Sequence, residues 1–168
     1  MEKQLLRRQW ILFFGVAAAG TLLHFAYRWS GGSPAVGVFA AVNESVWEHM
    51  KLLFVPLFVG VLLQSWAQGE LYPNTLAAGA VSTALGVALI PMLYYTYSGA
   101  LGKTWLAADA AIFYIVDAVA CLLELHLLKQ GKLSRPWQQL AGLLLLWGML
   151  FAFVWCTFRP PALPLWQE

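Results

Sequence analysis

The chain has 168 residues, of which 61% are hydrophobic and only 11% are charged, and its mean hydropathy is +0.68. A water-soluble domain needs about a quarter of its residues charged, so the composition excludes that class and indicates an integral membrane protein whose first partner is the lipid bilayer. The ten Lys and Arg residues are scattered and give a net charge of +2. They form no basic stripe, so we expect no nucleic-acid partner.

A first membrane span is predicted over about 10–29. Basic residues precede it and Ala17–Ala19 is similar to a cleavage site, so a removable signal peptide is the alternative interpretation. The apolar run continues to Tyr27, which favours an uncleaved span. The segment 33–42 is too apolar for an exposed loop and too short to cross the bilayer. We expect it to lie in the interface or to re-enter the bundle, with a helix start at Ser33–Pro34.

Four further spans are predicted at about 46–66, 73–95, 105–128 and 137–157. Each is close to the ~20 residues that cross the ~30 Å hydrocarbon core. Short loops with Gly, Pro and charged residues separate them, so consecutive helices should pack antiparallel. The sequence therefore predicts an all-α fold, a polytopic membrane helix bundle of about five transmembrane helices that forms a single integral membrane domain over residues 1–168.

Basic residues gather at two places that five spans put on the same side of the bilayer. They are Lys3, Arg7 and Arg8 before the first span, and Lys129, Lys132 and Arg135 between the fourth and fifth. The positive-inside rule places this side in the cytoplasm. We therefore expect a multi-pass cell-membrane protein with a cytoplasmic N-terminus and an extracytoplasmic C-terminus. Cys121 and Cys156 then fall toward opposite faces, so no disulfide is expected.

The stretch from Val42 to Pro56 carries an unusual density of ionisable residues for a membrane span. If it is helical throughout, Glu44, Glu48 and Lys51 occupy positions i, i+4 and i+7 on one face, and His49 points elsewhere. Two carboxylates and an amine on one face are suited to cation binding, proton relay or general acid and base catalysis. The structural alternative is a capping box, in which Ser45 and Glu48 satisfy the start of the helix.

Polar side chains from three spans fall at one depth. At ~1.5 Å per residue, His24, Lys51 and Asp109 each lie about 6–7 Å inside the Trp residue that marks the extracytoplasmic edge of their span. Asp117 lies near the middle of the fourth span and should face the bundle, paired with Lys51, His24, a Tyr hydroxyl or a bound cation. Glu124 lies near the cytoplasmic end and is interpreted as interfacial.

Each of these residues also has a structural interpretation. His24 fits a buried imidazole bonded to a carbonyl, Asp109 fits the favourable N-terminal dipole of its helix, and Lys51 fits a side chain that snorkels to the interface. The coincidence in depth is what these interpretations leave unexplained. Hydroxyl groups at the same end come from Tyr94, Tyr95 and Tyr97.

The sequence thus predicts a polar pocket within the membrane, near its extracytoplasmic side. Its candidate residues are His24, Glu44, Glu48, His49, Lys51, Asp109 and Asp117. Imidazole and carboxylate groups are ligands for divalent metals. The candidate ligands for such a cofactor are His24, Glu48, Asp109 and Asp117. No established catalytic motif accompanies them, so the catalytic residues are not assigned.

The segment Asn43–Phe54, followed by Pro56, resembles the signature of an uncharacterised family of small bacterial multi-pass membrane proteins. The resemblance is carried by the letters N-E-S-V-W-E-H-M-K-L-L-F. It implies a membrane location and marks this segment as characteristic, but it implies no activity.

Three functions are consistent with the sequence. The first is a pocket that binds a cation, a polar small molecule or a headgroup. The second is a membrane-embedded, metal-assisted hydrolase or transferase on a lipid-linked substrate, with Glu48 or Asp117 as base and His24 or His49 as ligand. The third is a structural or partner-binding subunit whose polar residues lock helix packing. Whether the protein is an enzyme stays open, as do its substrate and its oligomeric state.

Overall fold

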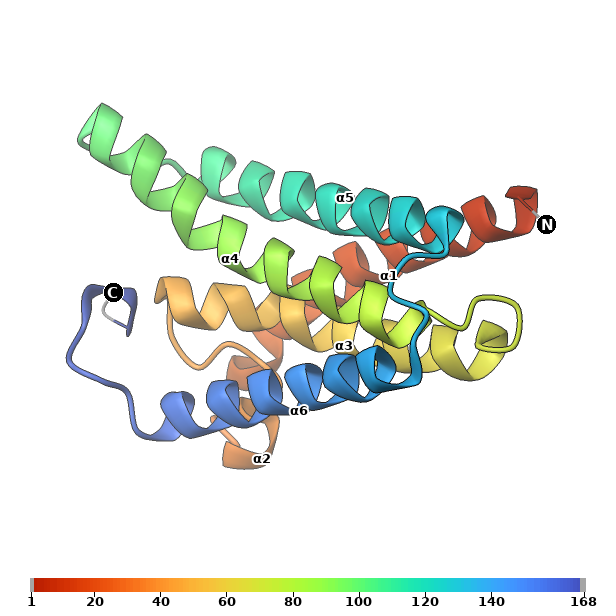
Figure 1. The fold of residues 1–168 in the computed structure, drawn as a ribbon. Coiled ribbons are helices and arrows are strands. Elements are labelled where there is room, and N and C mark those ends of the chain that lie inside the picture. Colours follow the sequence, from red (N-terminus) through yellow and green to blue (C-terminus); the bar gives the residue numbers. More distant parts are fainter. Residues whose placement is uncertain (1, 167–168) are drawn as a thin grey trace.

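The computed structural model describes residues 2–166, and within this range its regular structure is helical throughout (Figure 1). The elements are α1 (Glu2–Trp29), α2 (Pro34–Gly37), α3 (Val46–Gln68), α4 (Thr75–Leu101), α5 (Leu106–Gln130), α6 (Pro136–Phe158) and the short 3₁₀ helix η1 (Pro164–Trp166). Five of them, α1, α3, α4, α5 and α6, are long and apolar enough to cross a membrane. The predicted all-α fold with five spans is confirmed.

Local sequence explains where the helices begin and end. Pro34 opens α2 directly after Ser33, as predicted, and Pro136 opens α6, since the first turn does not need the N–H that proline lacks. Gly102 and Gly131 follow α4 and α5 in the left-handed conformation, with φ of 66° and 63°, which glycine adopts without strain. The short α2 lies in the predicted interfacial or re-entrant segment.

Figure 1 shows the five long helices side by side, each running opposite to the one before it. In their most apolar stretches, 61% of the α3 residues and 50% of the α4 residues are buried, against 17–22% in α1, α5 and α6. Helices α3 and α4 therefore form the centre. Helix α1 packs on α3 and α5, and α6 packs on α4 and α3. The exposed apolar residues of the outer helices suit a lipid bilayer.

Small residues let α4 approach its neighbours closely. A Cβ atom on Gly79 would lie 2.5 Å from the Val61 side chain of α3, and one on Gly86 would lie 3.2 Å from Cβ of Ala120 in α5. Ser82 and Thr83, which complete this small-residue stripe, are buried as well. The stripe therefore serves helix packing, as small residues commonly do in membrane bundles.

Gly142 provides a sharp test of this packing. Its Cβ would meet backbone atoms of α4, with Cα of Ala77 at 2.8 Å and O of Leu76 at 3.0 Å, whereas a Cβ on Gly148 of the same helix meets no atom within 4 Å. Gly142→Ala should therefore destabilise the protein by about 1–3 kcal/mol through overpacking. Gly148→Ala should be neutral or stabilising by up to about 1 kcal/mol, because alanine is the better helix former. Equal melting temperatures of the two variants in detergent would contradict the close packing of Gly142 against α4.

Candidate functional site

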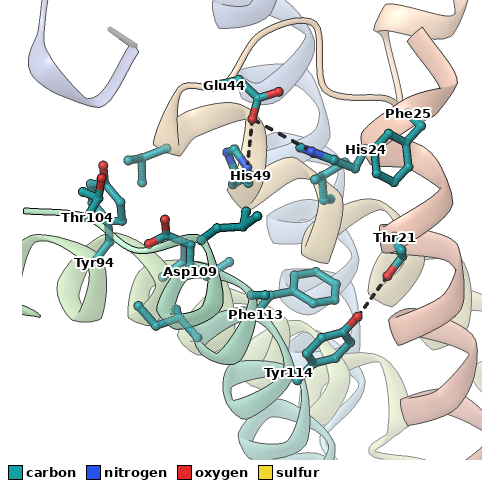
Figure 2. A pocket seen from close by; sticks show the side chains of 17 residues that line it. Thr21, His24, Phe25, Glu44, His49, Tyr94, Thr104, Asp109, Phe113 and Tyr114 are labelled. Carbon is teal, nitrogen blue, oxygen red and sulfur yellow. Dashed lines mark hydrogen bonds and ion pairs between the residues drawn. The ribbon is translucent and has the colours of Figure 1, made fainter. Parts of the chain in front are cut away.

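A pocket opens at the end of the bundle where α3 and α5 begin and α1 and α4 end, which we call the pocket end. Its volume is about 390 Å³, and it lies between α1, α3, α4, α5 and the loop before α3. Its wall is mostly apolar, with Phe25 and Phe113 among its residues (Figure 2). The polar side chains that line it are Thr21, His24, Glu44, His49, Tyr94, Thr104, Asp109 and Tyr114.

Two histidines converge on one carboxylate at the mouth of the pocket. The Oε2 atom of Glu44 lies 3.9 Å from Nε2 of His24 and 3.7 Å from Nε2 of His49, as the dashed lines in Figure 2 mark. One ligand atom from each of the three residues lies within 4.8 Å of the other two. The histidines come from α1 and α3, so the cluster joins two helices and the loop before α3.

The two imidazole rings are held differently. His49 Nδ1 lies 2.9 Å from the carbonyl oxygen of Ser45. A carbonyl only accepts, so Nδ1 donates its proton there, and in the neutral ring Nε2 then carries a free lone pair toward Glu44. The Nδ1 atom of His24 is buried and has no hydrogen-bond partner within residues 2–166. The ring of His24 also packs edge to face with Phe25.

Glu44 does not belong to the helical face that the sequence predicted. Helix α3 begins at Val46, because Ser45 is its N-cap and the Ser45 hydroxyl accepts a hydrogen bond from the Glu48 amide at 3.4 Å. Helical spacing therefore does not apply to Glu44, and the prediction that it shares a face with Glu48 and Lys51 is wrong. Glu44 instead lies beside His49, the residue expected to point elsewhere.

Glu48 and Lys51 form a separate cluster that does not line the pocket. Their charged atoms lie 2.7 Å apart, and both side chains are buried. The Lys51 ammonium also donates to O of Gly37 at 2.8 Å and to the Thr157 hydroxyl at 3.0 Å, so all three of its protons are used. Lys51 is fully buried and does not snorkel. The capping box is confirmed only in its Ser45 half, in which the Ser45 hydroxyl accepts from the Glu48 amide. The Ser45 amide donates to Oδ1 of Asn43 at 3.1 Å, and the Glu48 carboxylate accepts from the Val42 amide at 3.0 Å.

This Glu48 and Lys51 cluster has a structural effect on the pocket. It ties three parts of the chain together, since Gly37 belongs to α2, Thr157 to the end of α6 and the ion pair to α3. Thr157 also donates to Oε1 of Glu48 at 2.7 Å. The loop between α2 and α3 carries Glu44, so these contacts hold in place the loop that positions the Glu44 carboxylate at the pocket.

Asp109 lies in the first turn of α5 and lines the pocket. It accepts a hydrogen bond from the Tyr97 hydroxyl, one of the three tyrosines expected to supply hydroxyl groups at this end. Tyr94, another of the three, lines the pocket. The first-turn position also agrees with the dipole interpretation of Asp109, so both roles apply to it.

Asp117 lies deeper and outside the pocket. It is fully buried and faces the bundle as expected, but within residues 2–166 it pairs with neither Lys51, His24 nor a Tyr hydroxyl. The Cys121 thiol donates to its Oδ1 at 3.6 Å, and Oδ2 has no partner within residues 2–166. Glu124 is only 1% exposed, so its interpretation as interfacial is wrong. Cys121 and Cys156 are both free, as expected.

A family model matches residues 1–168 in full. The chain belongs to DUF6512, a family of unknown function. No curated protein and no solved structure matches the chain. The membership agrees with the resemblance to an uncharacterised family, and it assigns no activity.

In this DUF6512 chain, four of the seven candidate pocket residues line one cavity. They are His24, Glu44, His49 and Asp109. The four metal ligands proposed from the sequence do not gather in the described part of the chain, because Glu48 pairs with Lys51 and Asp117 lies beside Cys121. The group that converges is His24, Glu44 and His49. Sequence reasoning missed Thr21, Thr104 and Tyr114 as lining residues, and no pattern in the sequence singles them out.

Proposed function

We propose that this protein is a membrane-embedded cation-binding protein, and that His24, Glu44 and His49 bind a divalent transition metal, zinc above all. Two imidazoles and a carboxylate are a common donor set for Zn²⁺ in sites that keep a further position open. Ligand atoms around a tetrahedral zinc, with bonds of about 2.0–2.1 Å, lie about 3.3–3.4 Å apart. The separations of 3.7 and 3.9 Å between Glu44 and the two histidines are within reach of that arrangement after small side-chain movements.

The orientation of His49 is the observation that carries the proposal. Zinc-binding histidines commonly donate their other ring N–H to a carbonyl or carboxylate, which fixes the tautomer and aims the free nitrogen at the metal. The hydrogen bond from His49 Nδ1 to the Ser45 carbonyl has this form. The alternative is a simple ion pair between Glu44 and a protonated His49. Such a pair gives no reason for His24 to lie at the same carboxylate oxygen, whereas a metal site does.

We place the pocket end on the extracytoplasmic side. The opposite end carries the exposed basic residues Arg7, Lys129, Lys132 and Arg135, and the positive-inside rule assigns that end to the cytoplasm. The N-terminus would then be cytoplasmic and the C-terminus extracytoplasmic. The pocket would draw its ion from outside the cell.

A metal-assisted hydrolase or transferase on a lipid-linked substrate is the second candidate. It is supported by the cavity of about 390 Å³ beside the two histidines, which has room for a substrate headgroup, and by Asp109 on its wall. In this version Asp109, in place of Glu48 or Asp117, would be the base. Zinc-loaded protein should then release phosphate from a prenyl diphosphate in detergent, and Asp109→Asn should abolish the release while zinc stays bound.

Metal content of the purified protein tests the binding proposal. The protein should be prepared with an affinity tag that contains no histidine, exposed to zinc and passed through a desalting column in detergent. We expect stoichiometric zinc in the wild type, and loss of most of it in His24→Ala and in Glu44→Gln, because each removes one ligand. His126→Ala is the matched control, since His126 is the third histidine of the chain and is exposed on α5.

Equal zinc content in wild type and His24→Ala would reject the site, as would loss of zinc from His126→Ala alone. If the wild type retains no zinc, cobalt, nickel or iron, the metal-binding proposal is rejected. The packing role of the Glu48 and Lys51 cluster would then favour a structural subunit.

A further inference from the structure

Two carboxyl groups lie in the interior of the bundle without a cationic partner. Asp117 is 0% exposed and Glu124 is 1% exposed. Within residues 2–166 no Lys, Arg or His lies within ion-pair distance of either side chain. One oxygen of each carboxyl group has no hydrogen-bond partner in that range. A bare carboxylate inside a membrane is costly, so each must hold a proton or a cation, and such residues mark ion or proton pathways.

Other polar groups lie at depths between those of Asp117 and Glu124. The Cys121 thiol, one turn from Asp117, donates to it. Thr83 of α4 is buried and its hydroxyl has no partner among the described residues. Thr83 precedes Gly86 by one turn, and Gly86 packs on Ala120. Since α4 and α5 are antiparallel (Figure 1), Thr83 lies at a depth between the two carboxyl groups.

Side-chain amides continue from Glu124 to the end of the bundle opposite the pocket. The side-chain amide of the buried Gln9 in α1 lies close to the Glu124 carboxyl group, and it donates to Gln64 of α3 at 3.4 Å. Gln68 donates to Gln64 at 2.9 Å and accepts from Arg8 at 2.8 Å. Arg8 is only partly buried, so this series reaches the surface. The facing groups are thus Cys121 for Asp117 and Gln9 for Glu124, and Arg8 is the nearest cation in the series.

We propose that Asp117 and Glu124 carry protons through the bundle, between the pocket end and the opposite end, where Arg8 lies and which we call the Arg8 end. A proton from water at the pocket end binds the unpartnered oxygen of Asp117, which becomes neutral. It passes to Glu124, and Asp117 returns to its earlier state. Glu124 then releases it to water at the Arg8 end, so one proton crosses and no other bond changes. About 10 Å of helix separates the two residues, so water or the Thr83 hydroxyl bridges the gap.

The inference does not rest on the metal site. His24, Glu44 and His49 lie at the pocket end and contact neither Asp117 nor Glu124 in any interaction of the described residues. Loss of zinc binding would leave the proton pathway standing, and loss of proton movement would leave the zinc site standing.

Proton flux into liposomes tests the proposal. Wild-type protein is reconstituted with a pH-sensitive dye inside the vesicles, and a potassium gradient with valinomycin drives protons inward, with and without external zinc. We expect wild-type flux above that of protein-free vesicles in at least one condition. Asp117→Asn and Glu124→Gln should each reduce it to the level of protein-free vesicles, since an amide keeps the shape but does not exchange the proton. Glu70→Gln, at an exposed acid in the turn after α3, should match the wild type.

Infrared spectra of the same samples show whether the variants keep their fold, and they add a second readout. The wild type should show a band from protonated carboxyl groups at neutral pH that shrinks in each of the two variants. Wild-type flux equal to that of protein-free vesicles in both conditions overturns the proposal. So does unchanged flux in both variants, or uptake of sodium in place of protons under a sodium gradient.

Discussion

Lys51→Met should lower the free energy of unfolding by about 3–5 kcal/mol, because it leaves the Glu48 carboxylate buried without its charged partner. The methionine fills nearly the same volume, so lost packing adds little. Glu48 would keep only the Val42 amide and the Thr157 hydroxyl, and O of Gly37 would lose its donor. The melting temperature in detergent should fall accordingly.

Two further variants separate the buried pair from a general charge effect. The double variant Glu48→Gln with Lys51→Met should be more stable than Lys51→Met alone, because no uncompensated charge stays buried. Lys129→Met is the matched control, since Lys129 pairs with Glu2 at 2.6 Å but both side chains are largely exposed. It should change the melting temperature little, because exposed ion pairs contribute little. Equal losses in Lys51→Met and Lys129→Met would contradict the role assigned to the buried pair.

His49→Ala should weaken zinc binding by more than about 100-fold, because losing a direct ligand exceeds the 10–100-fold cost of losing an outer hydrogen-bond partner. Competition with a fluorescent chelator measures this change. Binding by the wild type should also weaken on acidification from about pH 7.5 to about pH 5.5, since protons compete with the metal for imidazole nitrogens. The effect has this sign because the metal needs the deprotonated ring.

The His126→Ala protein should follow the wild type at both pH values. His49→Ala should show a smaller pH dependence along with its weaker affinity, because one of the two competing rings is gone and His24 still competes for protons. A zinc affinity that is independent of pH in the wild type, or that survives in His49→Ala, would exclude imidazole coordination at this site.

The long helices could be predicted from the sequence because apolar runs of bilayer length are a strong and local signal. Their ends were less accurate for a physical reason. Helix α1 begins at Glu2 and not near residue 10, because charged residues continue a helix into water once the bilayer no longer limits it. The same extension explains the error at Glu124. Leu5 and Gln9 belong to the added turns, and they cover the inner face of α5 near Leu128 and Glu124.

The candidate site was predictable only in part. His24 and Asp109 were found because depth along a helix follows from residue count alone. The grouping of Glu44, Glu48 and Lys51 failed because α3 begins only after its N-cap Ser45, so Glu44 lies in the preceding loop and does not follow the helical spacing. Thr157, the partner of both Glu48 and Lys51, follows them by more than 100 residues. No local pattern can reveal a contact of that separation.

The contact between Lys51 and Thr157 also bears on how the protein is made. The ribosome completes α3 long before it reaches Thr157, so α3 enters the bilayer while its later partner is still unsynthesised. During that interval Glu48, only three residues away, must neutralise Lys51, and a lone lysine at this depth would oppose insertion. The ion pair therefore first lowers the cost of inserting α3 into the bilayer from the translocon. When α6 is inserted, Thr157 joins the pair, and the contacts of Lys51 with Thr157 and Gly37 then hold the loop that carries Glu44.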